Sequence, residues 1–283
     1  QIIALLGGRS VHPVGARVGG FHRAPSKSEV AQLLVEAKSA VVDAEALLRW
    51  LVTIELPQEE QNFVSVALSE PDAYPVMGRQ IVSDNGLDLP IEQFEQRFEE
   101  LQVPHSTAFH ALLDGEPYLV GPLARLNINN NKLHSKVKVL CGELGVRFPS
   151  RNMFDSIVAR GVELLQMIRE SVVLLEQYQR PSQPWSEFSP KAGVAFGATC
   201  APRGMLWHRY QLDAEGKIQS AQIVPPTSQN QARIEADLYY SLNQFGLDRS
   251  QEAIKLHGEQ VIRNYDPCIS CATHFLDLRM KQV

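Results

Sequence analysis

Two long stripes of apolar residues at helical spacing limit the folds open to this chain more than any other feature of its sequence. Ser26-Lys-Ser-Glu29 has the pattern of a capping box and predicts a helix that runs from there to about Thr53. A second stripe predicts another helix over about Asn152–Tyr178. Each stripe must be buried against a partner element, so we expect both helices to contribute to the core.

The other predicted elements are shorter. They are strands and turns in Phe63–Ser83, a short helix in Ile91–Leu101, a strand end at Tyr118–Val120, a β-hairpin or meander over Val194–Gly197, Met205–Leu212 and Ile218–Val224, and helices over Asn230–Gly246 and Gln251–Arg263. Together these elements predict a mainly α fold with a small β-meander, in a single domain over residues 1–283.

Charge and cysteine usage exclude several classes of protein. There are 27 Lys and Arg against 32 Asp and Glu, so no basic face for nucleic acid is expected. Charged residues interrupt both long apolar stretches, so no transmembrane segment is expected. Four cysteines are too few for a secreted disulfide scaffold, and no signal peptide opens the sequence, which favours a cytoplasmic location. The sequence begins with Gln1 inside an apolar run, which indicates a fragment or one half of a larger protein.

The most informative motif is Asp266-Pro-Cys268-Ile-Ser-Cys271-Ala-Thr-His274. Thiols three residues apart can both face one metal ion, and the histidine can join them or a neighbouring site. The motif is not the C-x-x-C-H of covalent haem attachment, it lacks the βαβ context of a thioredoxin, and a zinc ribbon would need a second C-x-x-C. Two core thiols beside an exposed histidine remain the structural alternative.

This ending resembles that of the large subunit of nickel–iron hydrogenases, and four other segments are similar to that family in the same order. They are Gly8-Arg9-Ser10-Val11-His12-Pro13 with Gly19-Gly20, Gly121-Pro122-Leu-Ala-Arg125, Ala201-Pro202-Arg203-Gly204-Met-Leu-Trp-His208, and Pro226-Thr227-Ser228-Gln-Asn230. One such segment is a modest signal, whereas five in the right order are highly specific. The resemblance covers about Gly7 to His274 and implies the multihelical fold of that large subunit.

The resemblance also implies a metal centre. In that family four thiolates hold nickel, and an iron carrying CO and two cyanides shares two of them. Carried over to this sequence, Cys268 would be a terminal nickel ligand and Cys271 would bridge nickel to iron. His274 would contact a nearby magnesium ion, together with the backbone carbonyl of Ile223.

The remaining site residues are also implied by the resemblance. Arg203 would place its guanidinium over the open coordination position, where a fixed positive charge stabilises charge that develops as H2 is cleaved. Thr227 would donate a hydrogen bond to a cyanide, and Pro202 and Pro226 would line the pocket of the diatomic ligands. The implied reaction is reversible heterolytic cleavage of H2.

The sequence also departs from the family pattern. The N-terminal C-x-x-C pair is absent, as is the N-terminal glutamate that serves as a proton gate, so the metal-binding N-terminal half is missing from this chain. Three explanations are open. The missing half could belong to a longer polypeptide of which this sequence is the C-terminal part, whether still attached or cleaved off, or it could be a separate polypeptide. Alternatively, this chain could be a degenerate relative that has lost the metal. The Gln1 start favours the first two explanations.

Two smaller departures concern side chains near the expected site. Cys200 stands where the family usually has glutamate, either as an extra thiol near Arg203 or as a packed small side chain. Cys141 is expected to be an inert buried thiol. Residues Phe275–Val283 follow His274, where most large subunits are trimmed, which indicates a precursor or a member that keeps its tail.

The expected partners follow from the resemblance. This chain has no spare cysteines for iron–sulfur clusters, so electrons would leave through an iron–sulfur small subunit. Diaphorase-type NAD(P) or flavin subunits would complete a cytoplasmic assembly. Two alternatives stay open at this point: a non-catalytic hydrogenase-like scaffold of a redox complex, and a zinc module that uses Cys268, Cys271 and His274.

Overall fold

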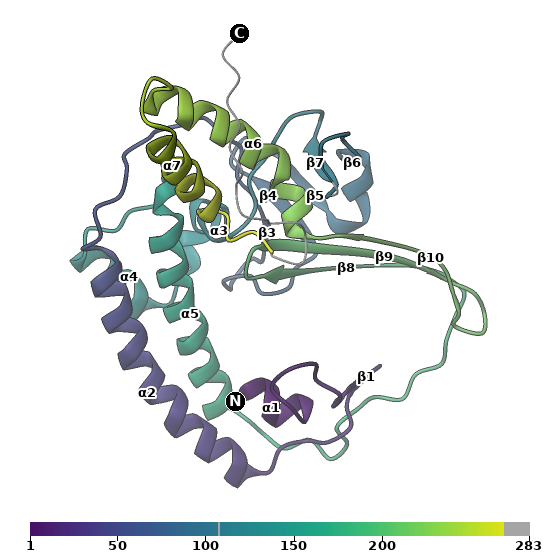
Figure 1. Ribbon diagram of the computed structural model, residues 1–283. Coiled ribbons are helices and arrows are strands. Elements are labelled where there is room, and N and C mark those ends of the chain that lie inside the picture. The colour runs from purple at the N-terminus through teal and green to yellow at the C-terminus, as the bar shows by residue number, and fades with distance from the viewer. Residues whose placement is uncertain (107, 269–283) are drawn as a thin grey trace.

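The computed structural model describes residues 1–106 and 108–268. Its longest elements are helices α2 (Lys27–Leu51) and α5 (Ser156–Glu176), which lie side by side (Figure 1). Both long helices predicted from the apolar stripes are therefore confirmed. α2 begins at the predicted capping box, where Ser26 Oγ accepts the Glu29 N–H at 3.2 Å and Glu29 Oε2 accepts the Ser26 N–H at 2.7 Å. α5 begins only after a 3-10 turn, η3 (Met153–Asp155).

One hydrophobic core lies between α2, α5 and two shorter helices, α3 (Pro122–Asn129) and α4 (Ser135–Glu143). Its fully buried side chains include Leu48, Leu126, Val137, Val162 and Leu165. The predicted strand end at Tyr118–Val120 was only partly right: Leu119 forms an isolated bridge to Ser65, and Gly121-Pro122 opens α3 instead of ending a strand. Proline suits the first turn of a helix because its missing N–H has no partner there.

A second core lies among the strands. β8 (Gly193–Ala201), β9 (Gly204–Leu212) and β10 (Ile218–Val224) form the predicted antiparallel meander, in the order β10-β9-β8. Trp207 is its largest buried residue; its ring stacks on Phe94 with centroids 4.6 Å apart, and its Nε1–H donates to Ile91 O at 2.8 Å.

More of the chain is β-structure than predicted. β3 (Val66–Ser69), β4 (Gln80–Ser83) and β5 (Asp88–Pro90) form a second sheet, and two hairpins pair β1 (Ala16–Arg17) with β2 (Gly20–Phe21) and β6 (Phe98–Leu101) with β7 (His110–Leu113). The predicted helix over Ile91–Leu101 is wrong in its second half, where a 3-10 turn, η1 (Ile91–Gln96), gives way to β6. With 43% helix and 21% strand, the protein is mainly α only in a rough sense.

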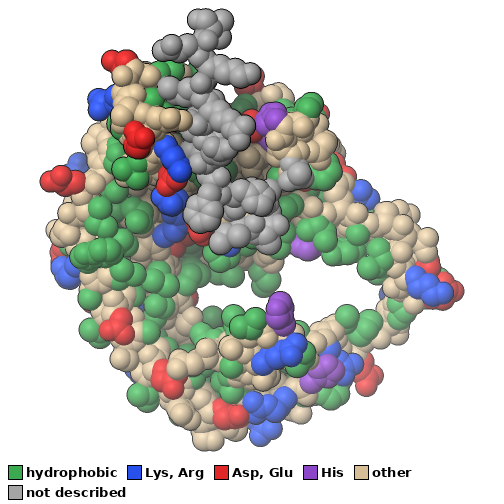
Figure 2. Space-filling model, in the orientation of Figure 1, with side chains coloured by type: hydrophobic (Ala, Val, Ile, Leu, Met, Phe, Trp, Pro, Cys, Tyr) green, Lys and Arg blue, Asp and Glu red, His purple; other side chains and the backbone are tan. Residues whose placement is uncertain are grey.

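The last described helices are α6 (Pro226–Phe245) and α7 (Gln251–Arg263), and α6 begins four residues earlier than predicted. Near α1 (Ile2–Gly7), the β1–β2 hairpin contacts the segment that leads to β8, through the bridge between Gly20 and Trp185 (Figure 1). Figure 2 shows an opening through the molecule between the N-terminal segment and the meander. Among the described helices, none has the length and apolar character needed to cross a bilayer.

Candidate functional site

Three of the sequence motifs meet at one turn. The turn joins β8 to β9 and consists of Ala201-Pro202-Arg203-Gly204. Arg125 on α3 fixes this turn by two hydrogen bonds. Its Nη1 donates to Ala201 O at 2.8 Å, and its Nη2 donates to Pro202 O at 3.1 Å. The backbone on the N-terminal side of Arg203 is thereby fixed by a residue 76 positions before Ala201 in the sequence.

Arg125 is itself held by a buried ion pair. Its Nε and Nη2 donate to the two carboxylate oxygens of Glu163 on α5, both at 2.6 Å, and both side chains are about nine-tenths buried. Burial alone would lower the pKa of Arg125, but the charge and hydrogen bonds of Glu163 outweigh burial and raise it. Tyr74 donates a further hydrogen bond to Glu163. The pair is satisfied on both sides, so it fixes the turn in one position.

Two glycines let the motifs approach one another. Gly204 has a φ of +145°, and a Cβ there would lie 2.5 Å from Val120 Cγ2 and 2.9 Å from Pro226 Cβ. Gly121 has a φ of +120°, and a Cβ there would lie 2.9 Å from Arg203 O. Any other residue would separate the backbones at these points, so glycine is required by close approach as well as by conformation.

The first turn of α6 closes the site on another side. The Asn230 side chain accepts the Val120 N–H at 2.9 Å and donates to Val120 O at 3.0 Å. It thus satisfies the two backbone groups of Val120 that a neighbouring strand would otherwise bind. Pro226 and Thr227 are buried beside Asn230, whereas Pro202 is exposed. Ile223 lies on the edge strand β10, opposite His208, and its side chain is 47% exposed.

Arg203 reaches the segment that carries the first predicted thiolate. Its Nε donates to the backbone oxygen of Asp266, and the Asp266 carboxylate lies 3.3 Å from the same nitrogen. Asp266 has a φ of +47°, a left-handed conformation that aspartate tolerates better than most residues. The Arg203 guanidinium therefore contacts a residue that stands only two positions before Cys268 in the sequence.

The approach to Cys268 is anchored by three further contacts. Asn264 O accepts from Ser156 Oγ at 2.8 Å and from Arg160 Nη2 at 2.5 Å, both on α5. The Tyr265 hydroxyl donates to Asp237 Oδ2 on α6 at 3.0 Å. Cys268 is half-buried at the end of the described chain. Cys271, His274 and the tail over residues 275–283 lie outside the described residues, so their predicted roles stay predictions.

A cavity of about 400 Å³ opens beside the turn and is lined by Tyr74, Arg125, Glu163, Cys200, Pro202 and Asp266, among others. Burial raises the pKa of Cys200 to about 11, although the charge of Arg125 opposes this shift. The Cys200 side chain packs against the core of the strands, which supports the packed small side chain. Cys141 is buried in the helical core, and burial raises its pKa to about 11, in keeping with an inert thiol.

Sequence reasoning missed the residues that support the turn. Glu163, Tyr74 and Arg160 belong to none of the recognised motifs, although a glutamate inside the apolar stripe of a predicted helix is a signal for a buried ion pair. Arg125 was part of a motif but was given no role. All four lie on the cavity wall, and none could be assigned a partner from local spacing.

The described residues fit one side of a nickel–iron centre. Cys268 offers a soft thiolate, the ligand type that such metals prefer, and Arg203 supplies a cation that contacts Asp266, two residues before Cys268 in the sequence. The sequence contains no second C-x-x-C pair, so two of the four thiolates would have to come from a polypeptide segment outside this sequence.

Comparison with known proteins gives the same picture. The family model described as nickel-dependent hydrogenase matches residues 112–274. In Pyrococcus furiosus, the protein named as the alpha chain of sulfhydrogenase 1 is 30% identical over 97% of this chain. An F420-non-reducing hydrogenase chain of Methanothermobacter thermautotrophicus is 27% identical over 99% of it. The chain spans 64% of the length of each of these relatives.

Solved structures share the fold. An NAD+-reducing NiFe-hydrogenase in the H2-reduced state superposes with a TM-score of 0.82 at 24% identity, covering 96% of this chain and 65% of that one. A NiFeSe hydrogenase of Desulfovibrio vulgaris Hildenborough superposes with a TM-score of 0.73 at 21% identity, covering 96% and 67%. At these identities the likeness is one of fold.

Proposed function

This chain belongs to the nickel-dependent hydrogenase family, and on that premise we propose that it forms the C-terminal part of a hydrogenase large subunit that cleaves H2. In this proposal Cys268 and Cys271 supply two of the thiolates of a nickel–iron centre, and thiolates absent from this sequence complete it. The chain then accounts for one wall of the site, and the expected N-terminal half accounts for the other.

The observation that carries the proposal is the contact between Arg203 and Asp266. It brings a guanidinium from the turn between β8 and β9 to the segment that leads into Cys268. Neither an isolated zinc module nor a docking scaffold has a need for a cation at this point, on a turn whose carbonyls a buried ion pair fixes. A site that stabilises developing charge does.

The residues have separate tasks in this proposal. The nickel–iron centre, when bound, supplies the redox chemistry of H2 cleavage, with CO and cyanide on the iron. Cys268 and Cys271 hold the centre, Arg203 presents a positive charge to the open position, and Thr227 donates a hydrogen bond to a cyanide. Arg125 acts as a positioning residue, because it fixes the carbonyls of Ala201 and Pro202 on the N-terminal side of Arg203.

A magnesium ion held by His274 and the carbonyl of Ile223 remains part of the proposal. So do the partners, which are an iron–sulfur small subunit together with diaphorase-type NAD(P) or flavin subunits. Two observations support the partners: the sulfhydrogenase relative is named as one chain of several, and a structural neighbour is named as NAD+-reducing. The cytoplasmic location stays a prediction. The non-catalytic scaffold is not favoured, because the relatives are named hydrogenases.

Elemental analysis of the intact purified assembly tests the proposal. We expect nickel and iron to co-purify with this chain, with iron in excess because of the clusters of the small subunit. Zinc in place of nickel that is lost in Cys268→Ser would support the zinc module instead. Absence of nickel, with no zinc that Cys268→Ser removes, would support the scaffold, and either result would overturn the proposal.

A further inference from the structure

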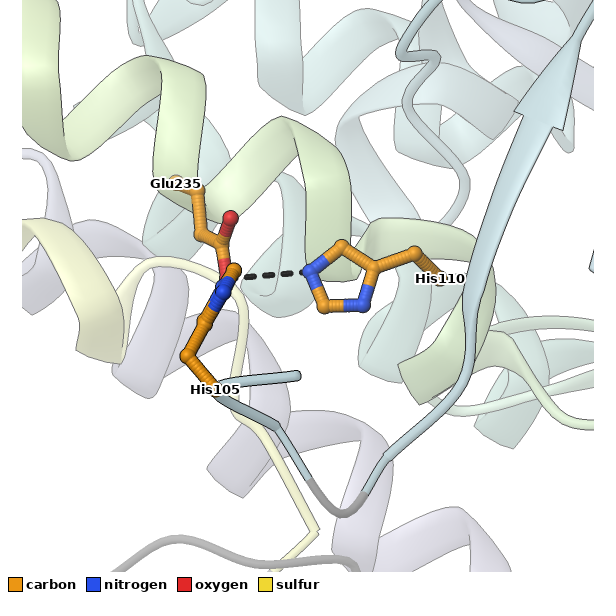
Figure 3. A group of neighbouring side chains, drawn as sticks. All are labelled: His105, His110 and Glu235. Carbon is orange, nitrogen blue, oxygen red and sulfur yellow. Dashed lines mark hydrogen bonds and ion pairs between the residues drawn. The ribbon is translucent and has the colours of Figure 1, made fainter. Parts of the chain in front are cut away.

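Away from the Cys268 segment, two histidines and one glutamate converge between a hairpin and a helix (Figure 3). His105 lies in the loop that connects β6 to β7, and His110 is the first residue of β7. Glu235 lies on α6, which packs against β7. The three side chains thus come from two different parts of the fold and point toward a common point.

The ligand atoms of these three side chains lie close together. The Nε2 atoms of His105 and His110 each lie 2.9 Å from the same Glu235 oxygen, Oε1. The three ligand atoms all lie within 4.8 Å of one another. Tetrahedral zinc with bonds of about 2.0–2.1 Å would separate its ligand atoms by roughly 3.3–3.4 Å. Two of the spacings are shorter than that value and the third is at most 4.8 Å, so side-chain adjustments of about 1.5 Å or less would admit an ion.

The burial of the three side chains differs in a useful way. The His110 side chain is 5% exposed, whereas the side chains of Glu235 and His105 are 42% and 64% exposed. His110 is thus fixed by burial, whereas the exposed side chains of Glu235 and His105 can move to bind an ion that enters from solvent. The exposed side leaves room for water at a fourth position.

The loop that carries His105 has internal support. Gln102 Nε2 donates to Val103 O at 3.3 Å and to Ser106 O, and Ser106 Oγ donates to Ala108 O at 3.0 Å. These contacts keep His105 near His110, and the two rings meet edge to face with centroids 5.8 Å apart. Part of the ordering that metal binding requires is therefore already present in the fold.

We propose that His105, His110 and Glu235 form a binding site for one divalent transition-metal ion of the zinc class, with water as the fourth ligand. Two imidazoles and one carboxylate are borderline and hard donors, which suit Zn²⁺ and disfavour the soft-ligand ions. The site shares no residue with the proposed nickel–iron centre and does not depend on the proposed function.

One feature of His110 sets the strength of this site. Its Nδ1 is buried and has no hydrogen-bond partner among the described residues. When Nε2 binds a metal the ring proton moves to Nδ1, and metal-bound histidines usually donate that proton to an acceptor. Because the described part of the chain offers Nδ1 no acceptor, we expect weaker binding than in zinc sites with a complete second set of hydrogen bonds, and zinc should be exchangeable.

The ion would join two parts of the fold. Without it, hydrogen bonds from both histidines to Glu235 connect the hairpin to α6 at this point. Glu235 lies eight residues after Thr227, which is about two turns along α6. Bound zinc would therefore restrict the motion of α6, the helix whose first turn contains Pro226 and Thr227.

Zinc titration of the intact assembly tests the proposal. After treatment with a chelator, Zn²⁺ is added to wild type, His105→Ala, Glu235→Gln and the control His22→Ala, which removes an exposed histidine elsewhere. Bound zinc, nickel and iron are then measured, and the zinc environment is determined by X-ray absorption. His105 is exposed, so its replacement leaves the core intact.

We expect one zinc per chain in wild type and His22→Ala, with nitrogen and oxygen neighbours at about 2.0–2.1 Å. His105→Ala and Glu235→Gln should lose that zinc, while their nickel and iron contents stay unchanged. Absence of zinc from wild type, equal zinc in His105→Ala, or sulfur neighbours at about 2.3 Å would overturn the proposal. The nickel and iron contents of wild type report on the proposed function independently.

Discussion

At the scale of single residues, the account depends on how Arg203 is held. Its guanidinium touches the backbone of Asp266, and Arg125 fixes the carbonyls on its N-terminal side. Arg125 is in turn paired with Glu163. A cation built into the site by successive contacts of this kind needs little reorganisation when charge develops nearby.

Replacement of Arg203 by lysine tests that role. Lysine keeps the positive charge but lacks the planar fork, so we expect nickel and iron to stay bound while H2 turnover falls by about 10- to 100-fold. Turnover is measured on the intact assembly as H2-dependent reduction of a dye. Arg209→Lys is the matched control, because Arg209 lies on the same strand pair but contacts Glu95. Unchanged turnover in Arg203→Lys would remove Arg203 from the mechanism.

At the scale of elements, α2 shows how a short pattern fixes a helix end. The Ser26 and Glu29 side chains satisfy each other's backbone N–H groups. Hydrogen bonds from the backbone and side chain of Ser26, followed by Arg23, lower the pKa of Glu29 to about 2. A carboxylate with a lowered pKa stabilises the folded state above the pKa of the unfolded chain, near 4.5, and this contribution is lost as the pH falls toward 2.

Ser26→Ala should therefore destabilise the protein by about 1 kcal/mol at neutral pH, the usual effect of losing an N-cap. The difference from wild type should shrink as the pH falls from about 4.5 toward 2, because the unfolded chain then binds a proton at Glu29 that folding must displace. Denaturant unfolding at several pH values measures this difference in the free energy of unfolding. Ser39→Ala, an exposed mid-helix change in α2, should show neither effect. An equal loss in both variants, or a difference independent of pH, would argue against this interpretation.

Elements with a strong period or a cap could be predicted, and those shaped by distant contacts could not. The apolar stripes indicated α2 and α5, and the turn at Asp213–Gly216 indicated the hairpin of β9 and β10. The polar segment Phe98–Leu101 is a strand because it pairs with β7. Local propensity does not record that pairing, so a helix was expected there.

At the scale of the whole molecule, sequence could indicate the family but not the construction of its site. Asn230 binds Val120 across 110 residues, and Gly204 allows Val120 and Pro226 to approach. The partners in such long-range contacts cannot be read from local spacing, which is why the roles of Glu163 and Tyr74 were missed. The chain spans 64% of the length of the relatives it matches, and the proposed four-thiolate site needs a second C-x-x-C pair that its sequence does not contain.

The central claim is that thiolates near residue 270 hold a nickel–iron centre, and infrared spectroscopy of the purified assembly tests it most directly. We expect bands from CO and cyanide in wild type and in the control Cys141→Ala, whose thiol lies in the helical core. Cys271→Ser should abolish the bands and the retention of both metals, because one thiolate would serve two ions. Wild type without these bands, or Cys271→Ser with all of them, would contradict the account.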